Sequence, residues 1–271
     1  MAESSIVLIT GGNTGLGYES VKALYASSQA HTILMGSRSL AKATDAIAKL
    51  QAEVPGSKSA IVPIQIDIED DKSIEKAFQK VKSKYGRIDT LVNNAGSTFD
   101  SIMLTDPSPS GIRATFNKAY SLNVTSSQVM THIFAPLLIA SSDPRLLFVT
   151  SGISSLERNS SDENSNFVRG PPPKGWPKPP VPSQIGYRTS KVALNMIMLE
   201  WKKTFKVDGV KVFGISPGFL ATNLGGMGPE FLKNMGAADP SIGGHFIRDV
   251  VEGKRDEGHG KVINKDGVMP W

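Results

Sequence analysis

The residues whose types and spacing most suggest chemistry in this chain are a tyrosine and a lysine four positions apart, Tyr187 and Lys191. On a helix, both side chains would lie on one face with Cβ atoms about 5 to 6 Å apart. A neighbouring ammonium and the positive end of the helix dipole both stabilise a phenolate, so we expect the pKa of Tyr187 to fall below its ordinary value of ~10. Such a phenol can donate a proton to a carbonyl oxygen or take one back. The alternative is an ordinary pair of surface neighbours.

A glycine-rich stretch follows the apolar run at residues 6–9, which predicts a buried parallel strand. Glycines at positions 11, 12, 15 and 17 permit positive φ and leave no Cβ between the backbone and a ligand. The first amides of the following helix can then face an anion, and a pyrophosphate is the natural occupant. The spacing is T-G-x-x-x-G-x-G rather than G-x-G-x-x-G. Tight packing alone is the other explanation of such a turn.

Apolar runs alternate with helical patterns along the chain, which is typical of right-handed βαβ units in a parallel sheet. Helices are expected from about 112 to 136 and from 186 to about 205. With 271 residues, of which 39% are hydrophobic, residues 1–271 are expected to form one α/β domain. The proline-rich segment 156–183 is expected to contain no regular helix or central strand. Strands are expected at 6–9, 31–35, 60–66, 88–93, 145–150, 210–215 and 261–263.

Composition excludes several kinds of site. The absence of cysteine excludes disulfides and thiolate catalysis, and the four histidines are scattered, so no metal site is expected. The first residues have no basic start, and no long apolar run occurs, so we expect a cytoplasmic protein that binds no membrane. The net charge of +5 is spread along the chain rather than gathered in a stripe, which argues against nucleic acid.

Five motifs occur in order along nearly the whole chain: Thr10-Gly11-x-x-x-Gly15-x-Gly17, Asn93-Asn94-Ala95-Gly96, Ser151, Tyr187-x-x-x-Lys191 and Pro217-Gly218. Together they resemble the short-chain dehydrogenase/reductase family. The resemblance implies a Rossmann-type doubly wound parallel sheet of seven strands, in the order 3-2-1-4-5-6-7, with helices on both faces. The long segment before Tyr187 is similar to the insertion in monomeric carbonyl reductases.

The same resemblance implies that the catalytic residues are Ser151, Tyr187, Lys191 and Asn123. Ser151 ends a strand at the edge where open parallel sheets bind ligands, and it would hydrogen-bond the substrate oxygen. Asn123 would position a water connected to the lysine, although a helix-interior Asn also commonly bonds the backbone. The neighbouring hydroxyl residues that compete with Ser151 for its role are Thr150, Ser154 and Ser155.

The end of the second expected strand predicts the cofactor. An acidic residue there would bind the ribose diol of NAD, whereas an arginine accommodates the 2′-phosphate of NADP. The chain has Ser37 and Arg38 at this place. A guanidinium binds phosphate bidentately, so we expect NADP(H), with a solvent-facing loop arginine as the other interpretation.

The resemblance also implies contacts of Asp67 and Ile68 with adenine, of Asn94 with the nearby ribose, and of Leu220 and Thr222 with the nicotinamide amide. The residues expected to bind NADP(H) are Thr10, Gly11, Asn13, Thr14, Gly15, Leu16, Gly17, Ser37, Arg38, Asp67, Ile68, Asn94, Ala95, Gly96, Tyr187, Lys191, Pro217, Gly218, Leu220 and Thr222.

We therefore expect an NADPH-dependent oxidoreductase that reduces a ketone or aldehyde to an alcohol, or catalyses the reverse, with the proton from Tyr187. Two other classes stay open: a reductase-derived enzyme for isomerisation, dehydration or cyclisation, and a nucleotide-sensing binding protein. A small carbonyl or alcohol is the expected partner, and a homo-oligomer stays open. Segment 156–183 is expected to be a lid that borders the substrate pocket or a cover over an interface. Apolar residues that line a pocket for a bulky substrate, or else cover the core, are Phe99, Phe167, Trp176, Met227 and Phe231.

Overall fold

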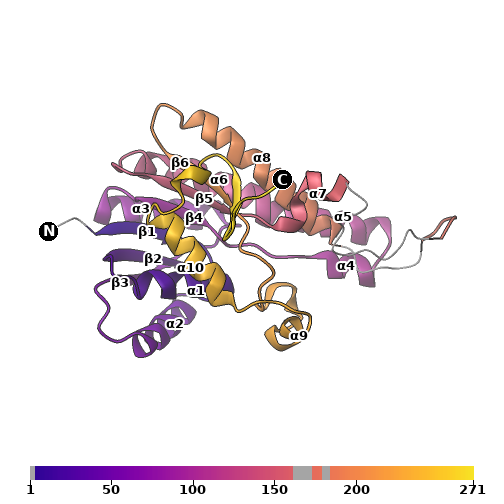
Figure 1. The fold of residues 1–271 in the computed structure, drawn as a ribbon, viewed down its shortest axis with the longest axis horizontal. Helices are drawn as coiled ribbons and strands as arrows, with labels where there is room; N and C mark the ends of the chain where they lie inside the picture. The colour runs from indigo at the N-terminus through magenta and orange to yellow at the C-terminus, as the bar shows by residue number, and fades with distance from the viewer. Residues whose placement is uncertain (1–3, 161–172, 179–183) are drawn as a thin grey trace.

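The computed structural model describes residues 4–160, 173–178 and 184–271, and its strands form one open sheet with helices on both faces (Figure 1). The strand order is β3-β2-β1-β4-β5-β6-β7-β8. The strands are β1 (Ser5–Ile9), β2 (His31–Ser37), β3 (Ala60–Gln65), β4 (Thr90–Asn93), β5 (Arg145–Val149), β6 (Lys211–Ile215), β7 (Val262–Asn264) and β8 (Gly267–Val268).

The doubly wound α/β fold and the order of the first seven strands confirm the sequence prediction. Strands β1 to β7 pair in parallel. The eighth strand was not expected, and it pairs antiparallel with β7. A tight turn makes this hairpin possible: Asp266 donates its amide to Asn264 Oδ1 at 2.9 Å, and Gly267 has a φ of +132°.

Two layers of helices cover the sheet because alternate residues of each strand point to opposite faces. One apolar cluster joins strand residues such as Leu91 to α3 (Asp71–Tyr85), α6 (Ser126–Leu138) and α8 (Ile185–Thr204). The other joins strand residues such as Val92 to α1 (Gly15–Tyr25), α2 (Leu40–Glu53) and α10 (Pro240–Val251). Helices α1 and α10 lie side by side (Figure 1).

The long helix expected from about 112 to 136 has three parts. They are α5 (Pro109–Tyr120), a π-helical turn (Ser121–Thr125) and α6. Single π-turns inside α-helices frequently occur at functional sites. Asn123 is the middle residue of this turn, so the irregular part of the helix coincides with a candidate catalytic residue.

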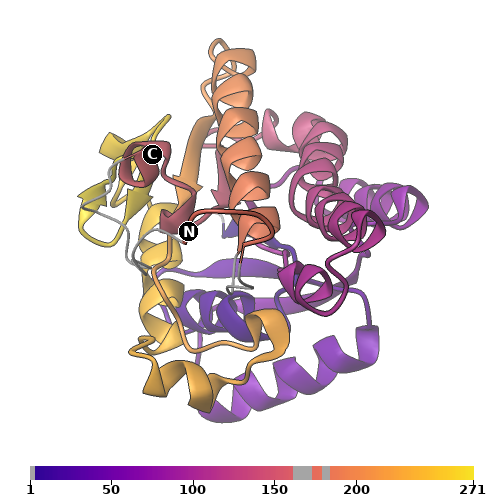
Figure 2. The same ribbon diagram turned by 90° about the vertical axis from the view of Figure 1, so that its right-hand side faces the viewer.

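Short elements gather at the edge formed by the carboxyl ends of the strands, which Figure 2 faces. They are α4 (Asp100–Thr105), α7 (Leu156–Ser160) and α9 (Pro229–Asn234). The expectation of no regular helix in segment 156–183 is wrong for its first five residues, which form α7 because they contain no proline. Much of the remaining segment, with Phe167 and the predicted lid, lies outside the described residues.

In the part of the chain that the structure describes, no helix is long and apolar enough to cross a membrane.

Candidate active site

Tyr187 and Lys191 lie one turn apart in the first half of α8, as their spacing predicted. Both side chains are buried, with 9% of Tyr187 and 4% of Lys191 exposed, which excludes the interpretation as surface neighbours. The Lys191 ammonium lies 5.6 Å from the centre of the Tyr187 ring. It donates a hydrogen bond of 2.8 Å to the carbonyl oxygen of Val149, the last residue of β5. The lysine therefore ties α8 to the end of β5.

Ser151 follows β5 and is the hydroxyl residue that interacts with the Tyr187 phenol. Its competitors make other contacts, and that of Ser155 is with the Arg158 amide, which its Oγ accepts at 3.1 Å. Thr150 donates to Asn195 Oδ1 at 2.6 Å, and Ser154 donates to the carbonyl oxygen of Ser151, also at 2.6 Å. The structure thus brings Ser151, rather than Thr150 or Ser154, into contact with the tyrosine.

The pKa values of the pair differ from the sequence expectation. Burial raises the pKa of Tyr187 to about 12, and the hydrogen bond with Ser151 only partly opposes this shift. Burial likewise lowers the pKa of Lys191 to about 8. The predicted fall in the tyrosine pKa is therefore wrong for this structure, because desolvation of the phenolate outweighs the opposing hydrogen bond with Ser151. Near neutral pH, the phenol holds its proton and the lysine is a cation.

Asn123 is fully buried and joins two parts of the site. Its side-chain amide donates to the Ser97 carbonyl oxygen and to Ser190 Oγ, both at 2.9 Å, and its Oδ1 accepts from the Ser97 amide at 3.0 Å. Ser190 in turn donates to the Tyr187 carbonyl oxygen at 2.7 Å. Gly96 makes this arrangement possible, because a Cβ there would lie 2.8 Å from Asn123 Oδ1 and 3.3 Å from Lys191 Nζ.

The glycine turn joins β1 to α1 and is built for close approach. A Cβ on Gly17 would lie 2.2 Å from the Gly11 carbonyl oxygen, so only glycine fits there. Thr14, which precedes α1, makes no side-chain cap, and the first turn of α1 has no acidic residue. The amides at this helix start are therefore suited to a phosphate, and this cradle fits the pyrophosphate of a dinucleotide.

Thr10 and Asn94 hold the glycine turn against β4. The Thr10 hydroxyl accepts the amides of Asn94 and Ala95, each at 3.0 Å. The Asn94 side chain donates to the Thr10 carbonyl oxygen at 2.8 Å. Asn94 was expected to face a ribose, but in the structure its amide group is directed at the backbone of the turn.

A groove lies between the glycine turn with α1 and the helix α2 that follows the end of β2. Ser37 is the last residue of β2, and its hydroxyl donates to the Ser39 carbonyl oxygen at 3.0 Å, while Arg38 is exposed. At the end of β3, the Asp67 amide donates to Ser73 Oγ at 2.9 Å, and Ile68 is buried. The groove is lined by Asn13, Thr14, Gly15, Tyr18, Lys42, Asp45, Ala46 and Lys49.

The chain after β6 returns over the glycine turn. Pro217 and Gly218 follow the strand, and Gly218 has a φ of +98°. Leu220 is buried and bridges to Ala238. Thr222 reaches back to the turn, since its Cβ lies 3.6 Å from the place of a Cβ on Gly15. Of the apolar residues expected near a pocket, Phe99 is half-buried, and those with large exposed surfaces are Trp176, Met227 and Phe231.

Three site residues were missed from the sequence: Ser97, Ser190 and Asp100. Ser190 lies three positions after Tyr187 on the same helix face, and this spacing was an available signal. Ser97 follows the Asn93-Asn94-Ala95-Gly96 motif directly. Asp100 is 4% exposed and accepts the amides of Gly186 and Tyr187, contacts that no local pattern indicates.

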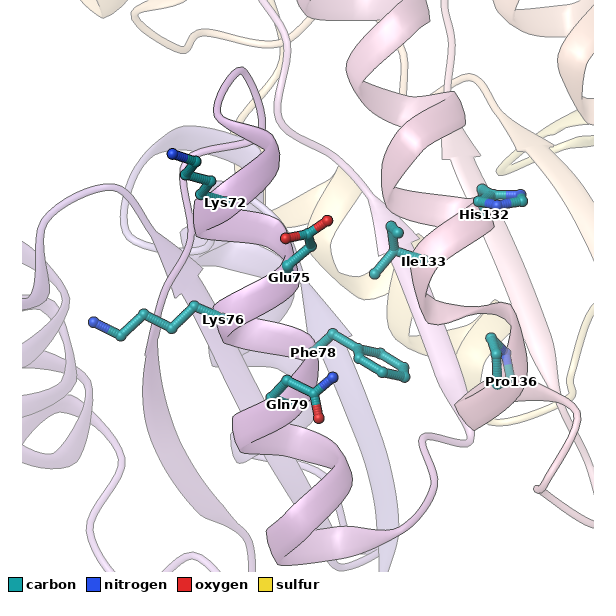
Figure 3. A pocket seen from close by; sticks show the side chains of 8 residues that line it. All are labelled: Lys72, Glu75, Lys76, Phe78, Gln79, His132, Ile133 and Pro136. Atoms are coloured by element: carbon teal, nitrogen blue, oxygen red, sulfur yellow. The ribbon is translucent and has the colours of Figure 1, made fainter.

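A separate groove lies between α3 and α6 (Figure 3). It contains none of the candidate residues, and only two helices contribute to it. Its lining residues are Lys72, Glu75, Lys76, Phe78, Gln79, His132, Ile133 and Pro136.

Comparisons with known proteins agree with the fold and with the motifs. Residues 5–161 match the family model described as short chain dehydrogenase. The chain is 44% identical over 276 residues to the short-chain dehydrogenase/reductase tropE of Talaromyces stipitatus, covering 100% of this chain and 99% of that protein. It is 43% identical over 275 residues to the short-chain dehydrogenase/reductase eupG of a Phoma species, covering 98% and 97%.

Two solved structures are similar over nearly their whole length. One is the NADPH-bound carbonyl reductase from chicken fatty liver, with a TM-score of 0.75, 20% identity and coverage of 99% of this chain and 100% of that one. The other is Pseudomonas aeruginosa RhlG in an active-site complex with NADP, with a TM-score of 0.74, 21% identity and coverage of 98% and 96%. At these identities, the likeness shows a shared fold.

Proposed function

Because this chain belongs to the short-chain dehydrogenase family and is therefore an NAD(P)-dependent oxidoreductase, we propose that it uses NADPH to reduce a ketone or aldehyde to an alcohol, or catalyses the reverse reaction. The single observation that carries the proposal is the contact of Tyr187 with Ser151 beside the buried ammonium of Lys191. We further propose that residues 1–271 act as one domain in the cytoplasm.

The chain's own residues have separate tasks in this mechanism. The Ser151 hydroxyl donates a hydrogen bond to the substrate oxygen and holds it beside the phenol. Tyr187 then donates its proton to that oxygen. A phenol pKa of about 12 suits this step, because the forming alkoxide is a far stronger base, with water itself at ~15.7. The nicotinamide, when bound, supplies the hydride that reaches the carbonyl carbon.

Lys191 and Asn123 support the tyrosine. The Lys191 cation stabilises negative charge that develops on the phenol as its proton leaves. Asn123 bonds Ser97 and Ser190, and Ser190 donates to the carbonyl oxygen of Tyr187, so the amide connects the segment after β4 to the helix turn that carries the tyrosine. Its proposed role in positioning a water beside the lysine comes from the family resemblance.

The buried acid-base pair argues against the nucleotide-sensing alternative. A nucleotide-sensing protein would gain nothing from a desolvated tyrosine and lysine, since burying them costs stability. Isomerisation, dehydration or cyclisation stays the second candidate, because the same groups can move protons without net redox. Absorbance of the reduced nicotinamide, followed during incubation with a panel of ketones and aldehydes, separates them. Consumption of NADPH with alcohol formation supports the proposal, and conversion without consumption supports the second candidate.

We propose NADP(H) rather than NAD(H) because of the charges around the end of β2. Arg38 is exposed at this place. Lys42 and Lys49, on the helix that follows, line the groove beside the glycine turn, where Asp45 is the one carboxylate among the lining residues. A phosphate on the adenosine ribose would gain from this excess of positive charge.

Replacing Arg38 with alanine should weaken NADPH binding by at least ~10-fold and NADH binding by less than ~2-fold, since only NADPH carries the 2′-phosphate that the guanidinium would bind. Dissociation constants measured by fluorescence titration check this expectation. Arg113, an exposed arginine on α5, is the matched control, and Arg113→Ala should leave both constants unchanged. Equal losses of affinity for NADPH and NADH in Arg38→Ala would show that the arginine has a structural role and does not bind the 2′-phosphate.

The pH dependence of the reaction follows from the lowered pKa of Lys191. Burial lowers this pKa to about 8, so the side chain is a cation below that pH and loses its proton above it. At saturating NADPH, the rate of reduction should be constant below about pH 8 and should fall as pH rises beyond it. A Lys191→Met variant should be slower and should lack this descending limb. A rate of reduction that rises through pH 8 in the wild type would refute a role for the cation.

Exposed apolar side chains near the candidate site are suited to binding an apolar substrate. Met227 and Phe231 are about half exposed at 47% and 54%, and they lie beside and on α9. Helix α9 lies at the same edge of the sheet as α4, which packs against α8 (Figure 1). Apolar groups left in water at the mouth of a site commonly bind an apolar ligand. We propose that these residues cover a bulky, apolar carbonyl compound.

A further inference from the structure

One buried carboxylate outside the expected site lies against the helix that carries Tyr187. Asp100 is the first residue of α4, which packs against the start of α8 at the carboxyl-terminal edge of the sheet (Figure 1). Its Oδ1 accepts the Gly186 amide at 2.8 Å, and its Oδ2 accepts the Tyr187 amide at 3.0 Å. The Thr98 hydroxyl donates to the same Oδ2 at 2.9 Å. Three donors therefore satisfy this carboxylate, and two of them belong to the first turn of α8.

Helix α8 has no cap from its own sequence. The first amides of a helix lack partners inside it and are usually satisfied by a Ser, Thr, Asp or Asn that immediately precedes the helix. Gln184 occupies that position in α8 and makes no side-chain cap. Other helices are capped locally: Asp70 caps α3 and Ser108 caps α5. The start of α8 is instead capped by a residue 86 positions earlier in the chain.

The fit between the carboxylate and the helix depends on a glycine. A Cβ on Gly186 would lie 3.2 Å from Asp100 Oδ1 and 2.9 Å from Thr115 Cγ2. The missing side chain lets the carboxylate and α5 reach the backbone directly before Tyr187. The place of the tyrosine backbone is thus determined by contacts with α4 and α5 as well as by its own helix.

The same short segment connects Asp100 to the rest of the site. Residues 97–100 begin at Ser97, whose amide and carbonyl groups both bond the Asn123 side chain. They end at Asp100, whose carboxylate holds the amides of Gly186 and Tyr187. One tetrapeptide therefore links the π-helical turn to the start of α8.

We propose that Asp100 is a positioning residue for the reaction: by holding the amides of Gly186 and Tyr187, it fixes the phenol beside Ser151 and Lys191. This inference rests on the proposed function of Tyr187 as the proton donor. Asp100 touches neither the substrate nor the cofactor in this role, and its effect reaches the chemistry through the backbone of the tyrosine.

The test compares Asp100→Ala with Asp70→Ala. Asp70 is a matched control because its Oδ1 also accepts two amides at a helix start, those of Lys72 and Ser73, in a helix that carries none of the candidate residues. Two quantities are measured: hydrogen exchange of the peptide that contains the start of α8, and the kinetics of carbonyl reduction. Loss of the cap should speed this exchange by at least ~10-fold in Asp100→Ala. The kcat of the same variant should fall by at least ~10-fold, because a small displacement of a catalytic group slows the reaction strongly. Its KM for NADPH should stay within ~3-fold of the wild type.

Asp70→Ala should leave both the exchange of the α8 start and kcat at the wild-type level. A second variant, Asp100→Asn, keeps the size of the side chain. It retains one acceptor oxygen and places an amide group opposite the other backbone N–H. Its exchange rate at the start of α8 and its kcat should therefore lie between those of Asp100→Ala and the wild type. It also serves if Asp100→Ala does not fold.

Two results would overturn the inference. Unchanged exchange at the start of α8 would show that the carboxylate does not hold this turn. Faster exchange with a wild-type kcat would show that the cap is structural and does not position the phenol. Failure of the proposed function is a separate result: wild-type turnover in Tyr187→Phe would remove the tyrosine from the chemistry, while the exchange data would still report on the cap.

Discussion

A Tyr187→Phe protein should fold and bind NADPH like the wild type but reduce carbonyl compounds at least ~100-fold more slowly. The substitution removes one hydroxyl from a side chain that is 9% exposed, and it leaves the ring packed in place. Removing a buried, partly satisfied phenol costs little stability. The proton donor is lost, however, and Ser151 holds the substrate oxygen without a group that can protonate it.

The matched control is Tyr25→Phe. Tyr25 is 8% exposed, ends α1 and lies outside the candidate site. Its substitution should change kcat by less than ~2-fold. Thermal melting curves establish that both variants are folded, and turnover at saturating NADPH with the best carbonyl substrate gives the comparison. A folded Tyr187→Phe protein with the turnover of Tyr25→Phe would refute the mechanism.

The second large effect is expected at the glycine turn, where Gly17→Ala should weaken NADPH binding by at least ~30-fold. The added Cβ would lie 2.2 Å from the Gly11 carbonyl oxygen and 2.6 Å from Asn94 Nδ2. The first of these atoms belongs to the backbone and the second to a side chain bonded to Thr10, so the turn itself must open. The helix start and the phosphate-binding amides would then separate.

Gly12→Ala provides the control in the same turn. There, the added Cβ would lie 3.0 Å from Met35 Cγ and no closer than 3.5 Å to a backbone atom, so the turn can stay closed and NADPH affinity should change by less than ~3-fold. Dissociation constants from fluorescence titration, together with circular dichroism of both variants, decide the matter. Similar affinities in the two alanine variants would contradict the assignment of the turn as the pyrophosphate cradle.

Much of the fold was predictable because it depends on local patterns. The apolar runs and the helical periods between them predicted where the first seven strands lie, and the family resemblance implied their order. The spacing of four residues placed Tyr187 and Lys191 one turn apart on a helix. Strand β8 and helix α7 were missed because each is short: two residues in a turn, and five proline-free residues before a proline-rich stretch. Neither has the length at which periodicity becomes informative.

The electrostatics of the site and its supporting contacts were not predictable from the spacing. The pKa of Tyr187 was expected to fall, but burial raises it to about 12, and burial is a property of the tertiary packing. Asp100 is a single acidic residue in an unremarkable stretch, and its partners are amides 86 and 87 positions further along the chain. Backbone donors leave no trace in a sequence pattern, so such a contact becomes visible only in the folded chain.

The central claim, that this protein transfers hydride to a carbonyl carbon while Tyr187 protonates the oxygen, is tested most directly with NADPH deuterated at the transferred position of the nicotinamide. The protein is incubated with this cofactor and a carbonyl compound that it consumes, and the product is examined by mass spectrometry and NMR. We predict an alcohol with one deuterium on the carbinol carbon, formed by the wild type and at least ~100-fold more slowly by Tyr187→Phe. A product without deuterium on that carbon, or equal rates of deuterium transfer by the two proteins, would contradict the account.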